Sequence, residues 1–219
     1  MLRADFHMHT HFSGDCLTPP EALVRRCEQV GLNCIAVTDH NSIEGARAVQ
    51  AIAAFQVILG EEIKSTAGEV TGLFLTEEIP PGLSPVETAR RIKAQGGLVS
   101  VPHPFTGMGR SSLSEEPLLE ILEYVDIVEG FNARTASSAA NDKGTAFAAE
   151  HGLPTTAVSD AHTTRELGRS YTELPEFDGT PEGFKAALRH ARLEKHPAGM
   201  LVHLYTTFAK LRHTLTPRR

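Results

Sequence analysis

The sequence predicts an α/β fold of the TIM-barrel-like class, a distorted (β/α)7 barrel of about seven strands with a metal site at the C-terminal ends of the strands. Short apolar runs typical of buried parallel strands alternate along the chain with amphipathic helical segments. Histidine and acidic residues directly follow most of these runs, and barrel enzymes place their active sites at that end. The alternative, an open doubly wound sheet, would usually carry a glycine-rich phosphate loop after its first strand, and this sequence has none there.

The chain starts with an extended segment that has Asp5, His7, His9 and His11 at alternate positions. Alternate residues of a strand face the same side, so His7 and His9 would present two imidazoles to one point, as the ligands of a divalent metal do. His11 continues this period, but a supporting or surface role fits it as well as ligation does. Asp15 follows in a Ser-Gly-Asp sequence, where by itself it would be a turn aspartate.

Helices are expected between the strands. The first should begin at a capping box, because Thr18 stands three residues before Glu21 and proline occupies the first turn. Apolar residues then recur at helical spacing as far as Gly31, where this helix should end. A second helix is expected over residues 42–55, and a third should begin at the capping box of Ser84.

Six apolar runs predict buried strands, most of which lead into histidine or acidic residues. The runs cover residues 34–37, 57–59, 70–75, 98–101, 125–128 and 155–158. The residues that follow five of them are His40, the pair Glu61 and Glu62, His103, Glu129, and the pair Asp160 and His162. Because successive residues of an extended chain point in opposite directions, only one of Glu61 and Glu62 can face the barrel mouth. The other is expected at the surface.

Each of the later candidate ligands has another interpretation. His40 could cap the helix that follows, although Asp39 beside it is the better cap candidate. His103 lies between two prolines, which fix its backbone, and it could be an idle histidine in a rigid loop. Asp160 and His162 are two residues apart and would face the same way, as a mixed carboxylate and imidazole ligand set does. A multinuclear metal site explains all of these clusters together.

Composition limits the class of protein. The length of 219 residues suits one domain (1–219), with a motif-bearing barrel at about 3–171 and a helical C-terminal segment at about 181–219 that includes a helix near 182–193. The net charge of −6 and the scattered basic residues argue against duplex nucleic acid as an obligatory partner. No leader or membrane-spanning apolar run is evident, so a cytoplasmic location without membrane contact is expected. Three cysteines without C-x-x-C spacing argue against a disulfide framework or a thiolate zinc site.

Five ordered motifs resemble those of the PHP (polymerase and histidinol phosphatase) family of phosphoesterases. They are Asp5-x-His7-x-His9-Thr, Thr38-Asp39-His40-Asn41-Ser42, Gly60-Glu61-Glu62, Pro102-His103-Pro104 and Ser159-Asp160-Ala161-His162-Thr163. The resemblance covers about residues 3–171 and implies the fold of that family, a distorted seven-stranded (β/α) barrel. It also implies two or three divalent metal ions, which could be manganese, zinc or iron.

The resemblance implies metal ligands at eight positions of this sequence. His7, His9, Glu62 and Asp160 would surround one ion, Asp15, His40 and His162 would bind another, and His103 would bind the ion that shares Glu62. Many members of the family have a further histidine in the strand after the glutamate, whereas this chain has Thr71 nearby and no imidazole. The resemblance therefore leaves open whether the ion of Glu62 and His103 is bound.

The activity that the resemblance implies is hydrolysis of a small phosphomonoester or nucleotide by metal-activated water. Arg110, Arg134 and Arg165 lie in loops near the candidate ligands and could bind the substrate phosphate through their planar guanidinium groups. Each could instead be a solvated surface arginine. His103 or Asp160 could protonate the leaving group, but a metal-bound residue is a poor proton donor, so the general acid stays open.

Other functions fit parts of the same pattern. Histidinol-phosphate phosphatase is one activity of the family, and an amidohydrolase-like enzyme that cleaves a C–N bond would use a similar barrel and metal set. A non-catalytic metal-binding module is a third alternative, which the near-complete ligand set disfavours. The expected partner is a small phosphorylated substrate, with nucleotides and short oligonucleotides among the candidates. The sequence does not fix the oligomeric state.

Overall fold

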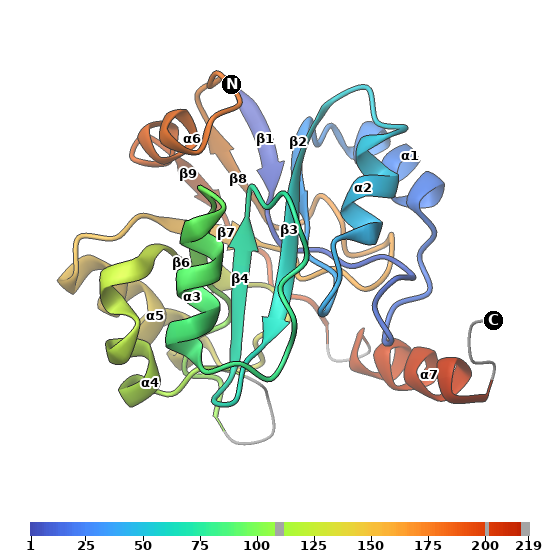
Figure 1. The fold of residues 1–219 in the computed structure, drawn as a ribbon. Helices are drawn as coiled ribbons and strands as arrows, with labels where there is room; N and C mark the ends of the chain where they lie inside the picture. The colour runs from blue at the N-terminus through green and yellow to red at the C-terminus, as the bar shows by residue number, and fades with distance from the viewer. Residues whose placement is uncertain (108–111, 200–201, 216–219) are drawn as a thin grey trace.

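The computed structural model describes residues 1–107, 112–199 and 202–215, and within these residues the chain forms one sheet of nine strands (Figure 1). In chain order the strands are β1 (Leu2–Asp5), β2 (Cys34–Val37), β3 (Gln56–Lys64), β4 (Glu69–Leu73), β5 (Leu98–Val101), β6 (Val125–Asn132), β7 (Thr155–Val158), β8 (Tyr171–Leu174) and β9 (Arg192–Glu194). Their order across the sheet is β7-β6-β5-β4-β3-β2-β1-β8-β9.

The sheet curls into a nearly closed barrel. β1, β2 and β3 are parallel neighbours, as are β5, β6 and β7, whereas β4 and β8 run antiparallel to the strands beside them. The barrel closes where the hydroxyl of Thr172 in β8 accepts a hydrogen bond from the backbone N–H of Ala157 in β7 and donates one to its carbonyl, both at 3.0 Å. The predicted α/β barrel is therefore confirmed, and the parallel strands direct their carboxyl ends to one side.

Two strands were not predicted, which is why the sheet has nine strands rather than about seven. In β8 only alternate residues are buried, and β9 has three residues of which one is exposed, so neither has the apolar run of a buried parallel strand. β4 was predicted as a strand, but it is the antiparallel return strand of a hairpin with β3, in which Glu62 lies opposite Thr71. Hairpin pairing depends on the turn between the strands and not on apolar character alone.

Helices lie outside the sheet and at its two ends. They are α1 (Pro20–Val30), α2 (Glu44–Gln50), α3 (Pro85–Ala94), α4 (Glu115–Glu120), α5 (Ser138–Glu150), α6 (Pro181–Leu188) and α7 (Val202–Leu215), with a 3-10 turn η1 at Leu122–Tyr124. The helix expected over 42–55 is thus shorter. The helix expected near 182–193 ends at Leu188, because residues 192–194 pair with β8. α4 and α5 were not predicted, whereas α7 lies within the helical C-terminal segment expected over 181–219.

The helix termini test the two predicted capping boxes. Ser84 caps α3 as predicted, since its Oγ accepts a hydrogen bond of 3.2 Å from the backbone N–H of Glu87. The prediction for Thr18 was wrong: the N-cap of α1 is Pro19, which offers no side-chain acceptor, so the hydroxyl of Thr18 stands one residue too early. Gly31 ends α1 in the left-handed conformation with φ 74°, as its position predicted.

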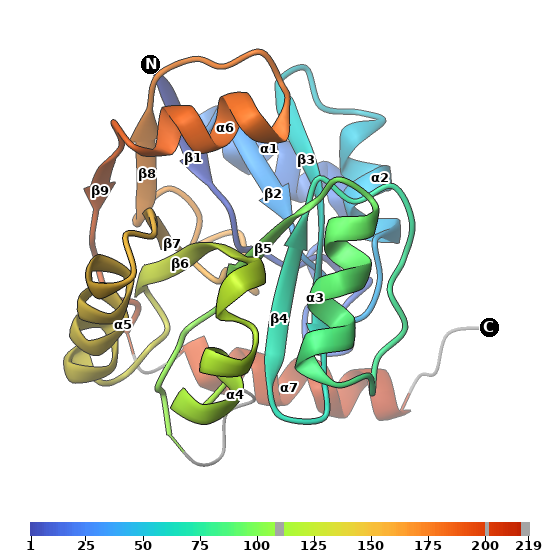
Figure 2. The same ribbon diagram turned by 60° about the vertical axis from the view of Figure 1, so that its left-hand side comes forward.

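The two ends of the barrel differ. α6 covers the amino end, where the fully buried ring of Phe184 packs against Phe6 with ring centroids 4.9 Å apart. α7 lies at the opposite end, so the two helices bracket the sheet (Figure 2). The carboxyl ends of β1, β2 and β3 point toward α7 (Figure 1). Within the described residues, no helix combines the length and the apolar character needed to cross a bilayer.

Candidate metal centre

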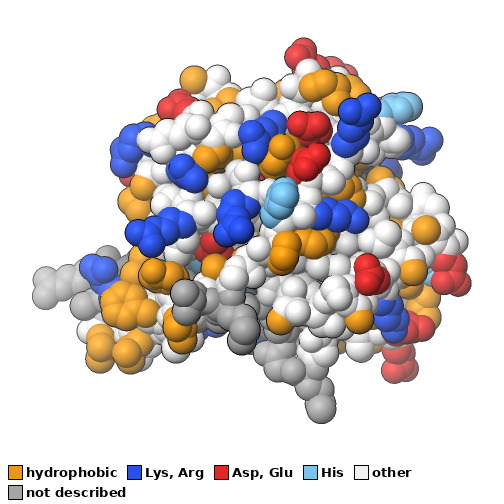
Figure 3. Space-filling model, turned by 180° about the vertical axis from the view of Figure 1, so that it is seen from behind, with side chains coloured by type: hydrophobic (Ala, Val, Ile, Leu, Met, Phe, Trp, Pro, Cys, Tyr) orange, Lys and Arg blue, Asp and Glu red, His pale blue; other side chains and the backbone are white. Residues whose placement is uncertain are grey.

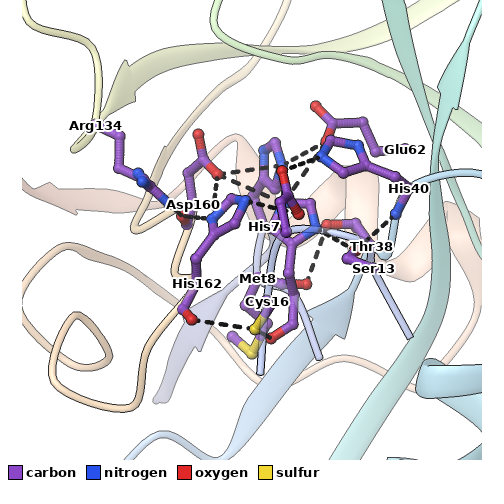
Figure 4. A network of polar contacts seen from close by, with 12 residues as sticks. His7, Met8, Ser13, Cys16, Thr38, His40, Glu62, Arg134, Asp160 and His162 are labelled. Atoms are coloured by element: carbon purple, nitrogen blue, oxygen red, sulfur yellow. Dashed lines mark hydrogen bonds and ion pairs between the residues drawn. The ribbon is translucent and has the colours of Figure 1, made fainter. Parts of the chain in front are cut away.

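His7 and His9 lie on the extended segment that continues β1. Met8 between them bridges Ala161 and accepts a backbone hydrogen bond of 2.9 Å from Thr38, and its side chain points away into the core. The alternation therefore places both imidazoles on one side, as predicted, with their Nε2 atoms 3.2 Å apart. Both rings are buried. Figure 4 shows that the labelled histidines and carboxylates converge on one point.

Glu62, on β3, is the centre of this convergence. Its Oε2 lies 3.4 Å from His7 Nε2, 3.6 Å from His9 Nε2 and 3.0 Å from His40 Nδ1. Its Oε1 lies 3.0 Å from Nε2 of His103, which follows β5. One carboxylate thus contacts four imidazoles.

Two further carboxylates complete the cluster. Asp15 lies between two histidines, with Oδ2 3.3 Å from His40 Nε2 and Oδ1 3.4 Å from His162 Nε2. Asp160, after β7, has its Oδ1 3.5 Å from His9 Nε2 and 3.8 Å from His7 Nε2. The Oδ1 atom of Asp15 has no hydrogen-bond partner within the described residues.

The eight ligand positions predicted from the sequence all lie in this cluster. Four overlapping groups have their ligand atoms within 4.8 Å of one another: His9, Asp15, His40 and His162; His7, Glu62 and His103; His7, His9 and Asp160; and His40, Glu62 and Glu69. His9 therefore joins the set that was expected to contain only Asp15, His40 and His162. His11 stacks on Phe12 with ring centroids 4.6 Å apart and belongs to none of these groups.

Hydrogen bonds assign the tautomer of three of the imidazoles. His7 Nδ1 lies 2.6 Å from a carboxylate oxygen of Glu129, and His162 Nδ1 lies 2.9 Å from the carbonyl oxygen of Asp160, so both Nδ1 atoms carry the proton. His9 Nδ1 lies 3.0 Å from Ser13 Oγ, which already donates to Asp39 and therefore accepts. Each Nε2 atom thus faces the centre and is the atom available to a metal ion, as metal-ligating histidines require.

The pKa values of the clustered groups show how burial and neighbouring charges act on them. Burial by itself would lower the pKa of His7, but the carboxylates of Glu129 and Glu62 raise it well above its usual value. Burial would raise the pKa of Glu62, but neighbouring imidazoles hold it well below its usual value. Burial and the neighbouring His162 lower the pKa of His9 to about 3, which leaves that ring neutral. Without a metal, the ionised carboxylates therefore keep a proton on His7, which a divalent cation would displace, while His9 is already neutral; such a set of carboxylate and imidazole donors fits divalent cations.

Glu69 is a candidate ligand outside the eight predicted positions: it was considered as a possible aid to the ion of Glu62 and His103, but the sequence did not show that it turns inward. Its carboxylate lies 3.6 Å from His103 Nε2 and 3.9 Å from His40 Nδ1. It precedes Thr71 by two residues on β4, so both face the site. Glu69 could therefore offer an oxygen ligand on the strand where many family members have a histidine. Burial and the neighbouring carboxylate of Glu62 raise the pKa of Glu69 to about 7. The two-residue spacing was the signal available in the sequence.

Two carboxylates support the candidate ligands from outside the cluster. Glu129 on β6 accepts hydrogen bonds from His7 Nδ1 at 2.6 Å, from the backbone N–H of His103 at 2.7 Å and from Asn132 Nδ2 at 2.9 Å. Asp39 accepts from the backbone N–H of Thr10 at 2.6 Å and also holds Ser13. Asp39 was weighed as a helix cap, but the N-cap of α2 is Ile43. The role of Asp39 is to fix the loop after His9.

The expectation of an exposed glutamate beside Glu62 was wrong. Glu61 does point away from the site, but it is fully buried and its Oε2 accepts a hydrogen bond of 2.9 Å from the backbone N–H of Ile79. The reason is that β3 continues to Lys64 and the segment around Ile79 covers its outer face. Burial raises the pKa of Glu61 to about 8.

The three predicted phosphate-binding arginines have different environments. Arg134 is buried, and its guanidinium donates to the carbonyl of Asp160 at 3.4 Å (Figure 4). It also donates to the carbonyl of Val202 at 3.2 Å and to the hydroxyl of Thr206. It therefore joins the candidate metal centre to α7. Arg165 is exposed in the loop after His162, and Arg110 lies outside the described residues. Phosphate binding by these residues stays a prediction, as do catalytic roles for His103 and Asp160, both of which lie inside the cluster.

Comparison with known proteins agrees with this geometry. Residues 5–109 match the model of the PHP domain, and residues 138–193 match the PHP-associated model. An uncharacterised protein of Methanocaldococcus jannaschii is 35% identical over 181 residues, which are 81% of this chain and 72% of that protein.

Solved structures share the fold. A two-domain protein from Bacteroides vulgatus, described as containing a predicted PHP-like metal-dependent phosphoesterase, has a TM-score of 0.70 at 21% identity and covers 95% of this chain and 69% of its own. An amidohydrolase from Chromobacterium violaceum has a TM-score of 0.64 at 16% identity, over 87% of this chain and 98% of its own. The matched domain, the relative and the clustered His, Asp and Glu residues lead to one conclusion: the chain belongs to the PHP family.

Proposed function

We propose that this protein is a metal-dependent phosphoesterase that hydrolyses a small phosphomonoester or a nucleotide with activated water. The observation that supports this most is the orientation of the imidazoles: three of them have Nδ1–H held by an acceptor and Nε2 directed at the same buried point. Ionised carboxylates surround that point, which is the donor set of a divalent metal centre.

Divalent ions bound here would neutralise the charge of a phosphate and activate water near neutral pH. The residues of the chain hold the ligands ready for this. Glu129 fixes the ring of His7, and Ser13 fixes that of His9. Asn132 Nδ2 lies 3.2 Å from an oxygen of Asp160 and 2.9 Å from Glu129, so it joins two carboxylates on opposite sides of His7. These hydrogen bonds hold the side chains that would contact the metal in the narrow range of geometries that catalysis needs.

Cleavage of a C–N bond is the second candidate, because the same donor set could activate water for that reaction and the fold is shared with an amidohydrolase. Histidinol phosphate is a further candidate substrate within the phosphoesterase proposal. Neither changes which residues hold the ions. They differ in the bond that is broken, so a panel of substrates separates them.

The test is hydrolysis by metal-stripped protein to which manganese, zinc or iron is added back. The panel contains nucleoside mono- and bisphosphates, short oligonucleotides, histidinol phosphate, a chromogenic phosphoester and N-acyl amides. We expect metal-dependent release of phosphate, strongest on one class of ester. Release of amine from the amides without release of phosphate would establish the C–N hydrolase instead.

Variants connect the activity to the cluster. His9→Ala and Asp160→Ala should abolish hydrolysis, while circular dichroism shows that both proteins stay folded. His190→Ala is the matched control, because His190 is exposed at the end of α6, on the opposite side of the barrel. Full activity of both cluster variants would contradict the proposal.

A further inference from the structure

α7 is fixed to the rim of the candidate metal centre. At its start, the carbonyl of Val202 accepts a hydrogen bond of 3.2 Å from Arg134, which also contacts Asp160. Near its end, Nε2 of His213 donates to the carbonyl of Cys16 at 2.9 Å, directly after Asp15 in the chain. The helix therefore lies beside the carboxyl end of the barrel, between two points that adjoin candidate metal ligands (Figures 1 and 2).

An apolar groove runs between α7 and the start of α1. Leu17, Pro19, Leu204, Tyr205 and Phe208 contribute to its walls, and its volume is about 570 Å³. The side chains of Tyr205 and Phe208 are 50% and 59% exposed, and apolar side chains gather on the surface over α7 (Figure 3). His162, one of the candidate ligands, also lines the groove, so the groove adjoins the metal centre.

Lys210 places a positive charge beside the cluster, on the helix that forms one wall of the groove. Its Nζ lies 3.5 Å from Oδ2 of Asp15, the carboxylate shared by His40 and His162. Its side chain is 64% exposed, so the ammonium group can reach an anion bound at this edge of the cluster. One helix thus carries both a cation beside the candidate ligands and the aromatic wall of the groove.

We propose that α7 forms the leaving-group side of the substrate site. The groove binds a flat, apolar leaving group, aryl or nucleobase-bearing, while Lys210 binds the phosphate of the same molecule. This inference rests on the proposed phosphoesterase function and narrows its substrate class. Exposed aromatic side chains bordering a concave apolar site favour a ring over a small polar group such as glycerol. In the reaction, the oxygen of a water molecule bonds to phosphorus, and the P–O bond to the leaving group breaks. The oxygen of the leaving group then takes a proton from the attacking water.

The first experiment measures selectivity with manganese-loaded protein. The substrates are 1-naphthyl phosphate and glycerol 3-phosphate, and the quantity is the ratio of their kcat/KM values. Phe208→Ala should lower this ratio about ten-fold, because a stacking contact to the ring is lost. The matched control is Leu211→Ala, which removes an exposed apolar side chain of the same helix outside the groove and should keep the ratio. An unchanged ratio in Phe208→Ala overturns the proposal.

The second experiment measures the role of Lys210. Lys210→Met should raise the KM for both substrates about ten-fold with a smaller effect on kcat, since it removes a charge that binds the phosphate in the ground state. Lys210→Arg should restore most of the lost affinity. Arg212→Met makes the same change of charge two residues along the exposed surface of the helix and is the control. Equal KM values for Lys210→Met and the unmodified protein would overturn this part.

Direct binding separates this inference from the function on which it rests. The probe is 1-naphthylmethylphosphonate, which has no hydrolysable P–O–C bond and reports binding through naphthyl fluorescence. If no ester is hydrolysed but the probe binds and Phe208→Ala weakens its binding about ten-fold, the phosphoesterase proposal fails and the groove assignment is supported. If esters are hydrolysed but the variant and the unmodified protein bind the probe equally, the groove assignment alone fails.

Discussion

Replacing Glu129 by glutamine should weaken metal binding without unfolding the protein. Glu129 is buried and accepts three hydrogen bonds, of which those from His103 N–H at 2.7 Å and Asn132 Nδ2 at 2.9 Å reach the same oxygen. The amide oxygen of glutamine can keep these two bonds. Its NH2 group then faces Nδ1 of His7, which must accept a hydrogen bond instead of donating one.

The change of tautomer at His7 determines how much metal affinity is lost. When Nδ1 of His7 accepts, the ring proton moves to Nε2, the atom that points to Glu62 at 3.4 Å. The lone pair toward the centre is then lost unless the glutamine hydrogen bond breaks. Removing such a supporting carboxylate typically lowers metal affinity about 10- to 100-fold, or about 1.4–2.7 kcal/mol. We expect the upper part of this range, because the Nδ1 to Oε1 distance is only 2.6 Å.

Competition against a chromophoric zinc chelator, with metal-stripped protein near neutral pH, measures the effect. Asp126→Asn is the matched control: it makes the same chemical change on β6, but its carboxylate holds Lys93 at 2.8 Å and Lys185 at 2.7 Å, outside the cluster. It should lower the melting temperature and leave zinc affinity unchanged. A folded Glu129→Gln protein with unchanged zinc affinity would refute the tautomer argument.

Three further predictions concern stability. In the folded protein the pKa of Glu61 is raised to about 8, from an ordinary value of 4.5. Between these two values the folded state keeps a proton that the unfolded state loses, so the free energy of unfolding falls by up to about 1.4 kcal/mol per pH unit as pH rises. Glu61→Gln should therefore raise the melting temperature at pH 8 more than at pH 5, and an equal change at both would count against it. A Cβ on Gly45 would lie 1.8 Å from Asp39 Oδ2, so Gly45→Ala should cost about 1–3 kcal/mol in urea unfolding, whereas Gly14→Ala, with open space, should be near neutral. Phe184→Ala should cost about 3–5 kcal/mol in the same assay, and a cost below 1 would mean that α6 does not close the barrel.

The sequence was sufficient for those features that depend on short spacing. The alternation of His7 and His9 and the positions after buried strands located all eight candidate ligands. Their convergence follows from parallel strands having a common carboxyl side. The end of α1 at Gly31 and the cap of α3 at Ser84 were likewise local.

What the sequence could not show depends on pairing between distant segments. Glu61 looked like a surface residue because nothing local reveals that the segment around Ile79 covers it. The contact of Glu129 with His7 joins residues 122 positions apart, so no motif contains it. The bounds of α7 could not be predicted within the helical segment expected over 181–219. Its apolar residues face outward over a groove and not into the core, so the usual relation between apolar spacing and burial does not hold there.

The position of Glu62 between four imidazoles has a consequence for the order in which ions bind. Because candidate sites that include His7, His40 and His103 share this one carboxylate, they are thermodynamically linked. An ion that binds on one side draws off negative charge and fixes the carboxylate orientation for the other side. The affinity of each ion therefore depends on whether its neighbour is present, and this dependence must be equal in both directions. Metal content should then respond to metal concentration as one coupled isotherm and not as a sum of independent sites.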